Sequence, residues 1–473
     1  MPSLVIDGDP FTHRCMAIDD LVDRLALGLV RIGVRHGDRV GIWGPNTLEW
    51  LHTQYAVASI GAILVNINPA CRPAELRQIA SQAGVQTIVS ASSYKTQEYY
   101  DIMAEVVPEI SSATPGKIRS QELPDLQSVI MYGGEKRPGT YVMDDVMSVG
   151  SDQEAKILRE CRSGTTGLPK GATLTHYNAV NSVYHLGRML QFDKFAHTAC
   201  CTVPFTHLLG CMLTSLCHVT FGVHSVVPSP GFDPEATIKA IDDERCTLIY
   251  GTPAMYVALF SHEAIARHDV SGIRTMMIGA SPTPPELILQ AKGIFRPEEI
   301  VTAYGITETC GVSISRPDDP EEKRIYTVGK VLPHVEVKIV DLDTREIVPL
   351  GSKGEICIRG YNVMKGYWGQ KEKTREVIDP NNWYLTGDIG TLDKDGYCQI
   401  VGRSKEMINR GGVKVFPSEV EDVLVRHPKV AAAQISYYKI PTYVRFVEAY
   451  PMTASGKVQK NQLQEELKDI ALD

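Results

Sequence analysis

One short stretch of the chain is rich in hydroxyls and glycines and could hold phosphate groups. It reads Ser163-Gly164-Thr165-Thr166-Gly167-Leu168-Pro169-Lys170-Gly171. Glycines let backbone N–H groups turn toward an anion, the hydroxyls donate further hydrogen bonds, and the lysine adds a positive point charge. The spacing excludes a Walker A loop, because no Gly-Lys-Ser/Thr follows four residues after a glycine. The alternative interpretation is a flexible surface loop.

Polar and glycine residues also follow several apolar, strand-like runs. Residues 246–250, 275–278 and 300–304 form three such runs, and each ends in Gly, Pro or polar residues. In α/β sheets, ligands bind in the crevice outside the carboxyl ends of the strands. We therefore expect the loops after these runs to carry more of the function than the helices do.

The elements that would position these loops alternate between helix and strand. An amphipathic helix ending at Gly33 is predicted by apolar residues at three- and four-residue spacing, namely Ile18, Leu21, Val22, Leu25, Leu29 and Ile32. Strands are predicted at 40–43, 62–67 and 85–89, and a helix opens at Pro73 and closes at Gly84. This alternation favours an α/β fold with mainly parallel sheets covered by helices. Short alternating segments over 328–400 predict a smaller antiparallel β unit, and a small terminal domain follows Gly402.

Length and composition narrow the class of protein. At 473 residues the chain exceeds the size at which one core keeps growing, so two or more domains are expected. A net charge of −8 without a basic run argues against nucleic acid as a partner. The most apolar stretch, 208–227, is interrupted by polar residues, so no transmembrane helix is expected. Eleven scattered cysteines are typical of buried thiols in a reducing compartment, and no targeting peptide is evident at the start.

The stretch 163–171 resembles the phosphate-loop signature S-G-T-T-G-x-P-K-G of the adenylate-forming superfamily, which comprises acyl-CoA synthetases, luciferases and peptide-synthetase adenylation domains. Further motifs of that superfamily follow in order. Pro204-Phe205-Thr206-His207-Leu208-Leu209-Gly210 resembles the element whose histidine lies beside the acyl pocket. Gly279-Ala280-Ser281 resembles the loop along the adenine. Tyr304-Gly305-Ile306-Thr307-Glu308 resembles the motif whose tyrosine packs on adenine and whose threonine bonds a phosphate. The resemblance implies that Glu308, with Thr166, holds Mg²⁺.

The later motifs imply the rest of the site. Trp383-Tyr384-Leu385-Thr386-Gly387-Asp388 resembles the T-G-D motif, in which the aspartate accepts from both ribose hydroxyls. Arg403 and Lys405 match the hinge motif, with Arg403 on the ribose and Lys405 at the pivot. Gly411 and Gly412 would form the loop that enters the site for thioester formation. Lys457 matches the lysine that contacts the acyl carboxylate and the α-phosphate.

Taken singly, most of these residues have an ordinary interpretation. His207 would be a satisfied core histidine, and Asp388, Arg403 and Lys457 would be solvated surface charges. The occurrence of all the motifs in the expected order favours the functional interpretation.

The resemblance, closest to the medium-chain fatty acyl-CoA ligase subgroup, implies a ligase that uses ATP, Mg²⁺ and coenzyme A to activate a fatty acid. It implies an adenylation domain over 1–402 and a hinge with a shortened C-terminal domain over 403–473. Ala303, Gly279 and Gly329 are small residues at positions that line the family's acyl pocket. A mitochondrial location is expected from the subgroup, with the cytoplasm as the alternative.

Two stretches depart from the family pattern. Arg159-Glu160-Cys161-Arg162 stands where an apolar strand leads into the phosphate loop. Between Pro417 and Lys457 too few residues remain for the usual terminal domain, and we place the loss between Ile435 and Tyr438. Skipped exons or an incomplete gene model would explain both. Three functions therefore stay open: a fatty acid:CoA ligase, a non-catalytic nucleotide- or acyl-binding variant of one, and an enzyme that stops at the acyl adenylate.

Overall fold

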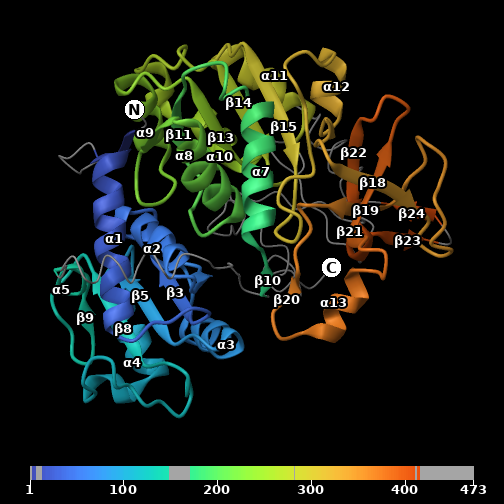
Figure 1. Cartoon of the computed structure of the whole chain (residues 1–473). Coiled ribbons are helices and arrows are strands. Elements are labelled where there is room, and N and C mark those ends of the chain that lie inside the picture. The colour runs from blue at the N-terminus through green and yellow to red at the C-terminus, as the bar shows by residue number, and fades with distance from the viewer. Residues whose placement is uncertain (1–2, 7–12, 149–170, 282, 411–412, 416–473) are drawn as a thin grey trace, which may run out of the picture. The chain divides into compact units, whose positions relative to one another are not determined.

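A computed structural model of the chain describes residues 3–6, 13–148, 171–281, 283–410 and 413–415 (Figure 1). The chain divides into two compact units. The first comprises residues 1–187, 204–232 and 363–374, and the second comprises 188–203, 233–362 and 375–473. Most of the predicted phosphate loop and nearly all of the predicted terminal domain lie outside the described residues.

The first unit contains a five-stranded sheet in the order β4-β3-β5-β8-β9, with every neighbouring pair parallel. Its strands are β3 (Arg39–Trp43), β4 (Ile63–Ile67), β5 (Thr87–Ala91), β8 (Ser128–Tyr132) and β9 (Tyr141–Val142). All residues of β4, β5 and β8 are buried, as expected of parallel strands covered on both faces. The three strands predicted in this region are confirmed.

Local signals explain where the helices of this sheet begin and end. These helices are α1 (Cys15–Arg31), α2 (Leu48–Ser59), α3 (Pro73–Ala83), α4 (Tyr99–Val106), η1 (Pro108–Ser111) and α5 (Met143–Met147). The Thr47 hydroxyl caps α2 by accepting from the Trp50 N–H. Pro73 begins α3, and Gly84 ends it in a left-handed conformation with φ of 63°. The predicted boundaries at Gly33 and Gly84 are confirmed.

The first unit has further elements outside this sheet. β1 (Ser3–Ile6) pairs parallel with β12 (His224–Val227) and antiparallel with β2 (His13–Arg14). β10 (Ala172–Thr173) pairs with β20 (Gly366–Tyr367). The others are β6 (Ser93–Tyr94), β7 (Gln97–Glu98), most of α7 (His176–Met189), the π-helical η2 (Gly210–Cys217) and α8 (His218–Phe221). None of the helices in the described ranges combines the length and apolar character that a membrane crossing requires.

The second unit carries a parallel arrangement whose strand ends form the loops of interest. β11 (Thr198–Cys201), β13 (Leu248–Gly251), β14 (Thr275–Gly279) and β15 (Glu299–Tyr304) pair in parallel, and the short β16 (Ser313–Ile314) and β17 (Lys330–Val331) continue antiparallel. Its helices are α9 (Pro234–Asp243), α10 (Pro253–Ser261), η3 (Glu263–Ala266), α11 (Pro285–Ile294) and α12 (Glu321–Tyr326). The predicted strands at 246–250, 275–278 and 300–304 are confirmed.

A separate antiparallel sheet follows in the same unit (Figure 1). It orders β18 (Val335–Val340), β19 (Gly354–Gly360), β21 (Tyr384–Leu392) and β22 (Cys398–Arg403). α13 (Lys371–Val377) precedes β21, and η4 (Ser404–Glu406), β23 (Ile408–Arg410) and β24 (Val413–Val415) follow β22. The predicted α/β class and its antiparallel unit are both confirmed.

Candidate active site

The carboxylate of Asp388 is the centre of the candidate site in the second unit. It lies on β21 with only 4% of the residue exposed. The hydroxyl of Tyr304, the last residue of β15, donates a hydrogen bond of 2.6 Å to its Oδ2 atom. The parallel strands and the antiparallel sheet therefore meet through these two side chains.

Arg403 approaches the same carboxylate from the neighbouring strand. Asp388 and Arg403 are facing residues on β21 and β22, and Arg403 Nε lies 3.0 Å from Oδ1 of Asp388. The arginine side chain is 61% exposed, so the ion pair joins a buried anion to a cation at the surface. Each carboxylate oxygen has two lone pairs, which leaves Asp388 able to accept further hydrogen bonds.

The surroundings of Asp388 perturb its acidity in opposite directions. Burial raises its pKa, the Tyr304 hydrogen bond and the Arg403 charge lower it, and the charge of Glu308 raises it. Burial also raises the pKa of Tyr304, as does the adjacent Asp388 charge. Tyr304 is therefore a donor toward Asp388. A buried carboxylate with remaining acceptor capacity suits a vicinal diol such as a ribose.

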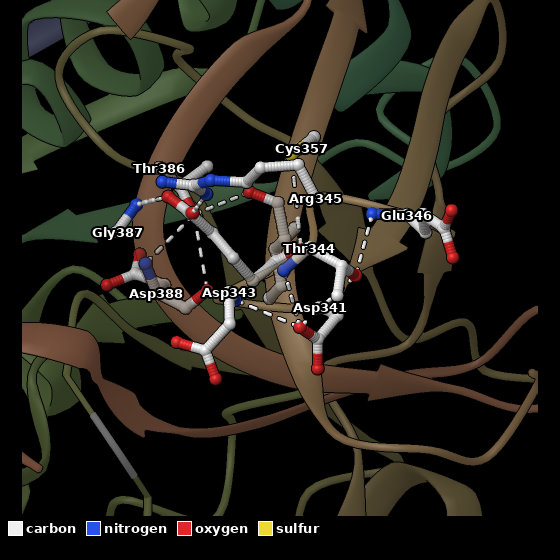
Figure 2. Close-up of polar contacts among 11 residues, drawn as sticks. Asp341, Asp343, Thr344, Arg345, Glu346, Cys357, Thr386, Gly387 and Asp388 are labelled. Carbon is white, nitrogen blue, oxygen red and sulfur yellow. Dashed lines mark hydrogen bonds and ion pairs between the residues drawn. The ribbon is translucent and has the colours of Figure 1, made fainter. Parts of the chain in front are cut away.

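A bulge in β21 presents Asp388. Glu355 of β19 faces Ile389, and Cys357 faces Leu385, so residues 386–388 lie opposite the single residue Ile356. The Thr386 hydroxyl donates to the Ile356 carbonyl at 2.8 Å and accepts from the Asp388 N–H at 3.0 Å. Figure 2 shows Thr386, Gly387 and Asp388 on this stretch of β21. The T-G-D motif is thus a local departure from the strand ladder.

The loop after β15 holds Thr307 and Glu308, both half-buried. A Cβ at Gly305 would lie 1.9 Å from the Cys310 carbonyl oxygen, so the loop requires glycine there. The side chain of Asn362, fully buried, donates to the Thr309 carbonyl at 2.9 Å and to the Gly311 carbonyl at 2.8 Å. Asn362 thereby fixes the loop that carries both predicted residues.

Sequence reasoning assigned no role to Asn362. The residue follows β19 in the string Arg359-Gly360-Tyr361-Asn362, which matches none of the motifs that carry the chemistry. Its function depends on carbonyls about fifty residues earlier in the chain, and no local pattern encodes that distance.

The loop after β14 lies next to the Tyr304 strand. Gly279 faces Ala303 in the β14–β15 register, and a Cβ at Gly279 would lie 3.0 Å from the Ala303 carbonyl oxygen. Ala280 has a φ of 68°, a left-handed conformation that is uncommon for a residue other than glycine. Such backbone outliers cluster at ligand-binding loops. Ser281 follows, half-buried.

The backbone conformation and close packing at Gly329 both require glycine. Its φ is +78°, and an added Cβ would lie 2.0 Å from the Ile314 carbonyl carbon. Close packing against β16 therefore demands glycine at this position whether or not a ligand lies nearby.

His207 belongs to the first unit and lies in the turn between β11 and η2. Its Nδ1 accepts from the Leu209 N–H at 3.2 Å, so in the neutral imidazole the proton sits on Nε2. The Phe205 N–H donates to the Asn46 side chain at 2.7 Å, and a Cβ at Gly210 would lie 2.2 Å from the Pro204 carbonyl oxygen. These contacts fix the turn that carries the half-buried histidine.

The other predicted residues are only partly described. Lys405 lies exposed in η4. Gly171, the last residue of the phosphate-loop stretch, has a φ of 51°, and its carbonyl accepts from the Trp368 N–H at 2.6 Å. Outside the described residues lie Ser163, Gly164, Thr165, Thr166, Gly167, Lys170, Gly411, Gly412 and Lys457.

The protein supplies few metal ligands in the described ranges. These ranges contain no group of three or more His, Cys, Asp and Glu side chains that could hold a metal ion. Mg²⁺ is commonly held by one or two carboxylates together with water and substrate phosphates. Glu308 supplies one half-buried carboxylate. One carboxylate suits a magnesium ion that is otherwise held by water and substrate phosphates, and it does not suit a site whose ligands all come from the protein.

Comparison with known families decides the ancestry of this site. The family described as AMP-binding enzyme matches residues 5–368, which is well over half of the chain. The chain belongs to the AMP-binding enzyme family. The predicted membership is confirmed, and the loops after β14 and β15 lie within the matched region.

Relatives within the family match the chain nearly from end to end. It is 39% identical to "Medium-chain acyl-CoA ligase ACSF2, mitochondrial" of Rattus norvegicus, over 98% of this chain and 85% of that protein. It is 35% identical to "Putative acyl-CoA synthetase YngI" of Bacillus subtilis, over 94% of this chain and 90% of that protein. The alignment with the rat protein runs over 523 residues and is longer than this 473-residue chain. The rat protein therefore carries internal segments that this chain lacks.

Solved structures share the fold at lower identity. The anthranilate CoA ligase AuaEII, solved with anthranoyl-AMP, is 23% identical with a TM-score of 0.82, covering 98% of this chain and 94% of its own. ATP-bound MatB from Rhodopseudomonas palustris is 23% identical with a TM-score of 0.81, covering 99% and 96%. These matches show that this chain has the fold of the adenylate-forming enzymes.

Proposed function

We propose that the chain is an AMP-forming fatty acid:CoA ligase that activates a medium-chain acid. The observation that carries this proposal is the 39% identity, across 98% of the chain, to a protein named as a medium-chain acyl-CoA ligase. The relative's name also supports a mitochondrial location. The substrates are then a fatty acid, ATP and coenzyme A.

The first half-reaction forms an acyl adenylate. A carboxylate oxygen of the acid attacks the α-phosphorus of ATP, a P–O bond forms, and pyrophosphate leaves. Asp388 accepts from the ribose hydroxyls, beside Arg403, while the ring of Tyr304 packs on the adenine. The 2.6 Å hydrogen bond from Tyr304 to Asp388 supports this assignment, because it links the adenine-packing ring to the ribose acceptor.

Negative charge that accumulates on the phosphates requires donors that are already in place. Ser163, Gly164, Thr165, Thr166, Gly167 and Lys170 are proposed to bind the phosphates, with Thr307 donating a further hydrogen bond. Glu308 and Thr166 would hold Mg²⁺, which neutralises phosphate charge when bound. Lys457 would contact the acyl carboxylate and the α-phosphate. Gly279, Ala280 and Ser281 would line the adenine.

The second half-reaction transfers the acyl group to sulfur. The thiol of coenzyme A attacks the acyl carbonyl, AMP leaves, and the thiol proton is released. His207 is proposed to lie beside the acyl group, and Gly411 and Gly412 to enter for this step. Lys405 would mark the hinge about which the terminal domain rotates between the two reactions.

A second candidate function follows from the length difference. Because the aligned rat ligase is longer than this whole chain, internal segments are missing, and a chain that lost part of its terminal domain would bind substrates without turning them over. The third candidate, an enzyme that stops at the adenylate, differs only in the thioester step.

ATP–pyrophosphate exchange in the presence of octanoate separates the three candidates. Exchange together with octanoyl-CoA formation supports the ligase. Exchange without thioester indicates the adenylate-only enzyme, and ATP binding without exchange indicates the non-catalytic variant. The Lys457→Ala variant tests the proposed role of the lysine. It should abolish pyrophosphate exchange and leave ATP binding largely intact. Undiminished exchange would remove Lys457 from the mechanism.

A further inference from the structure

Glu355 is a buried carboxylate beside the bulge that presents Asp388. It lies on β19, 5% exposed, where the register with β21 shifts. Its Oε1 atom accepts from the Gly387 N–H at 2.9 Å, and its Oε2 atom accepts from the Arg345 guanidinium. A buried carboxylate needs such partners, because burial penalises an unpaired charge heavily.

Glu355 contacts the bulge through the N–H of Gly387. Gly387 has a φ of +71°, and a Cβ there would meet nothing closer than the Ser404 hydroxyl at 3.8 Å. Position 387 therefore requires glycine because its backbone is left-handed, since there is space for a side chain. In this conformation the N–H turns away from the strand ladder and donates to Glu355. The hydrogen bond fixes the residue directly before Asp388.

A tightly bonded turn presents Arg345 to Glu355. The turn joins β18 to β19, and Oδ1 of Asp341 accepts from the N–H groups of Asp343 and Thr344, each at 2.9 Å. The Arg345 N–H donates to the Asp341 carbonyl at 3.1 Å, and its φ is 63°. Figure 2 shows Arg345 extending from this turn toward Gly387 and Asp388. A cation delivered in this way neutralises Glu355 without touching Asp388.

We propose that Glu355, neutralised by Arg345, is a positioning residue that fixes the T-G-D bulge so that the Asp388 carboxylate faces the ribose. The inference rests on the proposed role of Asp388 as ribose ligand. Asp388 needs such support, because Tyr304 already contacts its Oδ2 atom and Arg403 its Oδ1 atom, so the ribose must share both oxygens with these partners. A bulge free to relax would let these partners turn the carboxylate away from the nucleotide.

Calorimetric binding of ATP and of 2′,3′-dideoxy-ATP to the full chain tests the proposal without requiring turnover. Glu355→Leu removes the acceptor for Gly387, whereas Glu355→Gln keeps an acceptor oxygen of the same reach. Glu336→Gln is the matched control, because Glu336 of β18 also pairs with an arginine, Arg359 of β19, but its side chain is 57% exposed and it pairs with β19 at a position outside the register shift. Melting temperatures confirm that each variant folds.

Glu355→Leu should weaken ATP binding about tenfold, the worth of one hydrogen bond, and leave dideoxy-ATP binding unchanged. Glu355→Gln should retain most of the affinity, and Glu336→Gln should match the unaltered chain. If Glu355→Leu does not fold, Arg345→Met, at an exposed side chain, should give a smaller loss in the same direction.

If Glu355→Leu loses the same affinity for ATP as for dideoxy-ATP, the role of Glu355 is only structural and the proposal is wrong. Failure of the unaltered chain to prefer ATP over dideoxy-ATP would overturn it as well. The ligase assignment can fail separately. If the chain shows no pyrophosphate exchange but prefers ATP over dideoxy-ATP, and Glu355→Leu weakens only ATP binding, the positioning role is supported and turnover is refuted.

Discussion

The hydroxyl of Tyr304 donates to Asp388 across 2.6 Å, although 84 residues separate the two positions. One residue ends a parallel strand, and the other lies in a bulge of an antiparallel sheet. Two motifs that would contact the adenine and the ribose of one nucleotide are therefore already joined within the second unit.

Tyr304→Phe should move the pH dependence of ATP use. An Asp388 carboxylate must be ionised to accept from ribose hydroxyls, so kcat/KM for ATP falls as pH falls through its pKa. Burial raises that pKa and the Tyr304 hydrogen bond lowers it. Removing the hydroxyl therefore raises the pKa further, and the acidic limb of the kcat/KM profile should shift to higher pH.

The matched control for this variant is Tyr397→Phe. The Tyr397 hydroxyl donates to the Asp319 carboxylate at 2.8 Å, both residues are buried, and neither belongs to the predicted site. Its profile should stay where it is in the unaltered enzyme. An acidic limb that moves equally in both variants, or in neither, would refute the ionisation of Asp388 as the controlling event.

Gly305→Ala should destabilise the loop after β15. The added Cβ would lie 1.9 Å from a backbone carbonyl oxygen, and backbone cannot yield as a flexible side chain can. We expect a loss of about 1–3 kcal/mol in the free energy of unfolding, measured by urea denaturation, as in other overpacked sites. Gly293→Ala, on α11 with open space around it, should instead be neutral or stabilising. The reverse order of stabilities would show that this loop is not tightly packed.

Chelation of divalent metal should abolish pyrophosphate exchange, and added Mg²⁺ should restore it. Glu308→Gln should lower kcat for exchange by about 100-fold, because the Mg²⁺ that neutralises the phosphate charge would lose an anionic ligand. Nucleotide binding measured by calorimetry without metal should change little. Glu322→Gln, at an exposed position on α12, serves as the control. Exchange that survives both chelation and Glu308→Gln would exclude the proposed metal role.

Local signals were enough to predict much of the fold. Pro73 and Gly84 bound α3 because proline suits a first helical turn and glycine a left-handed end. The apolar runs before Gly279 and Gly305 are parallel strands, since residues buried on both faces leave continuous apolar sequence.

Contacts between distant segments could not be predicted in the same way. Tyr304 was assigned to the adenine and Asp388 to the ribose, yet nothing in either motif indicates that their side chains are hydrogen-bonded to each other. Glu355 lies in an alternating strand, where a charged residue is ordinarily a solvated one, yet it is buried where the register with β21 shifts. Asn362 acts on carbonyls of a loop from another sheet.

The central claim, that the acid is activated as an acyl adenylate, is tested most directly with octanoate labelled with ¹⁸O in both carboxylate oxygens. Attack of the carboxylate on the α-phosphorus leaves one labelled oxygen on the phosphate when coenzyme A displaces AMP. Mass spectrometry of a complete reaction should therefore find one ¹⁸O in AMP, none in pyrophosphate, and octanoyl-CoA in equal amount. Unlabelled AMP, or label in an inorganic phosphate product, would contradict the account.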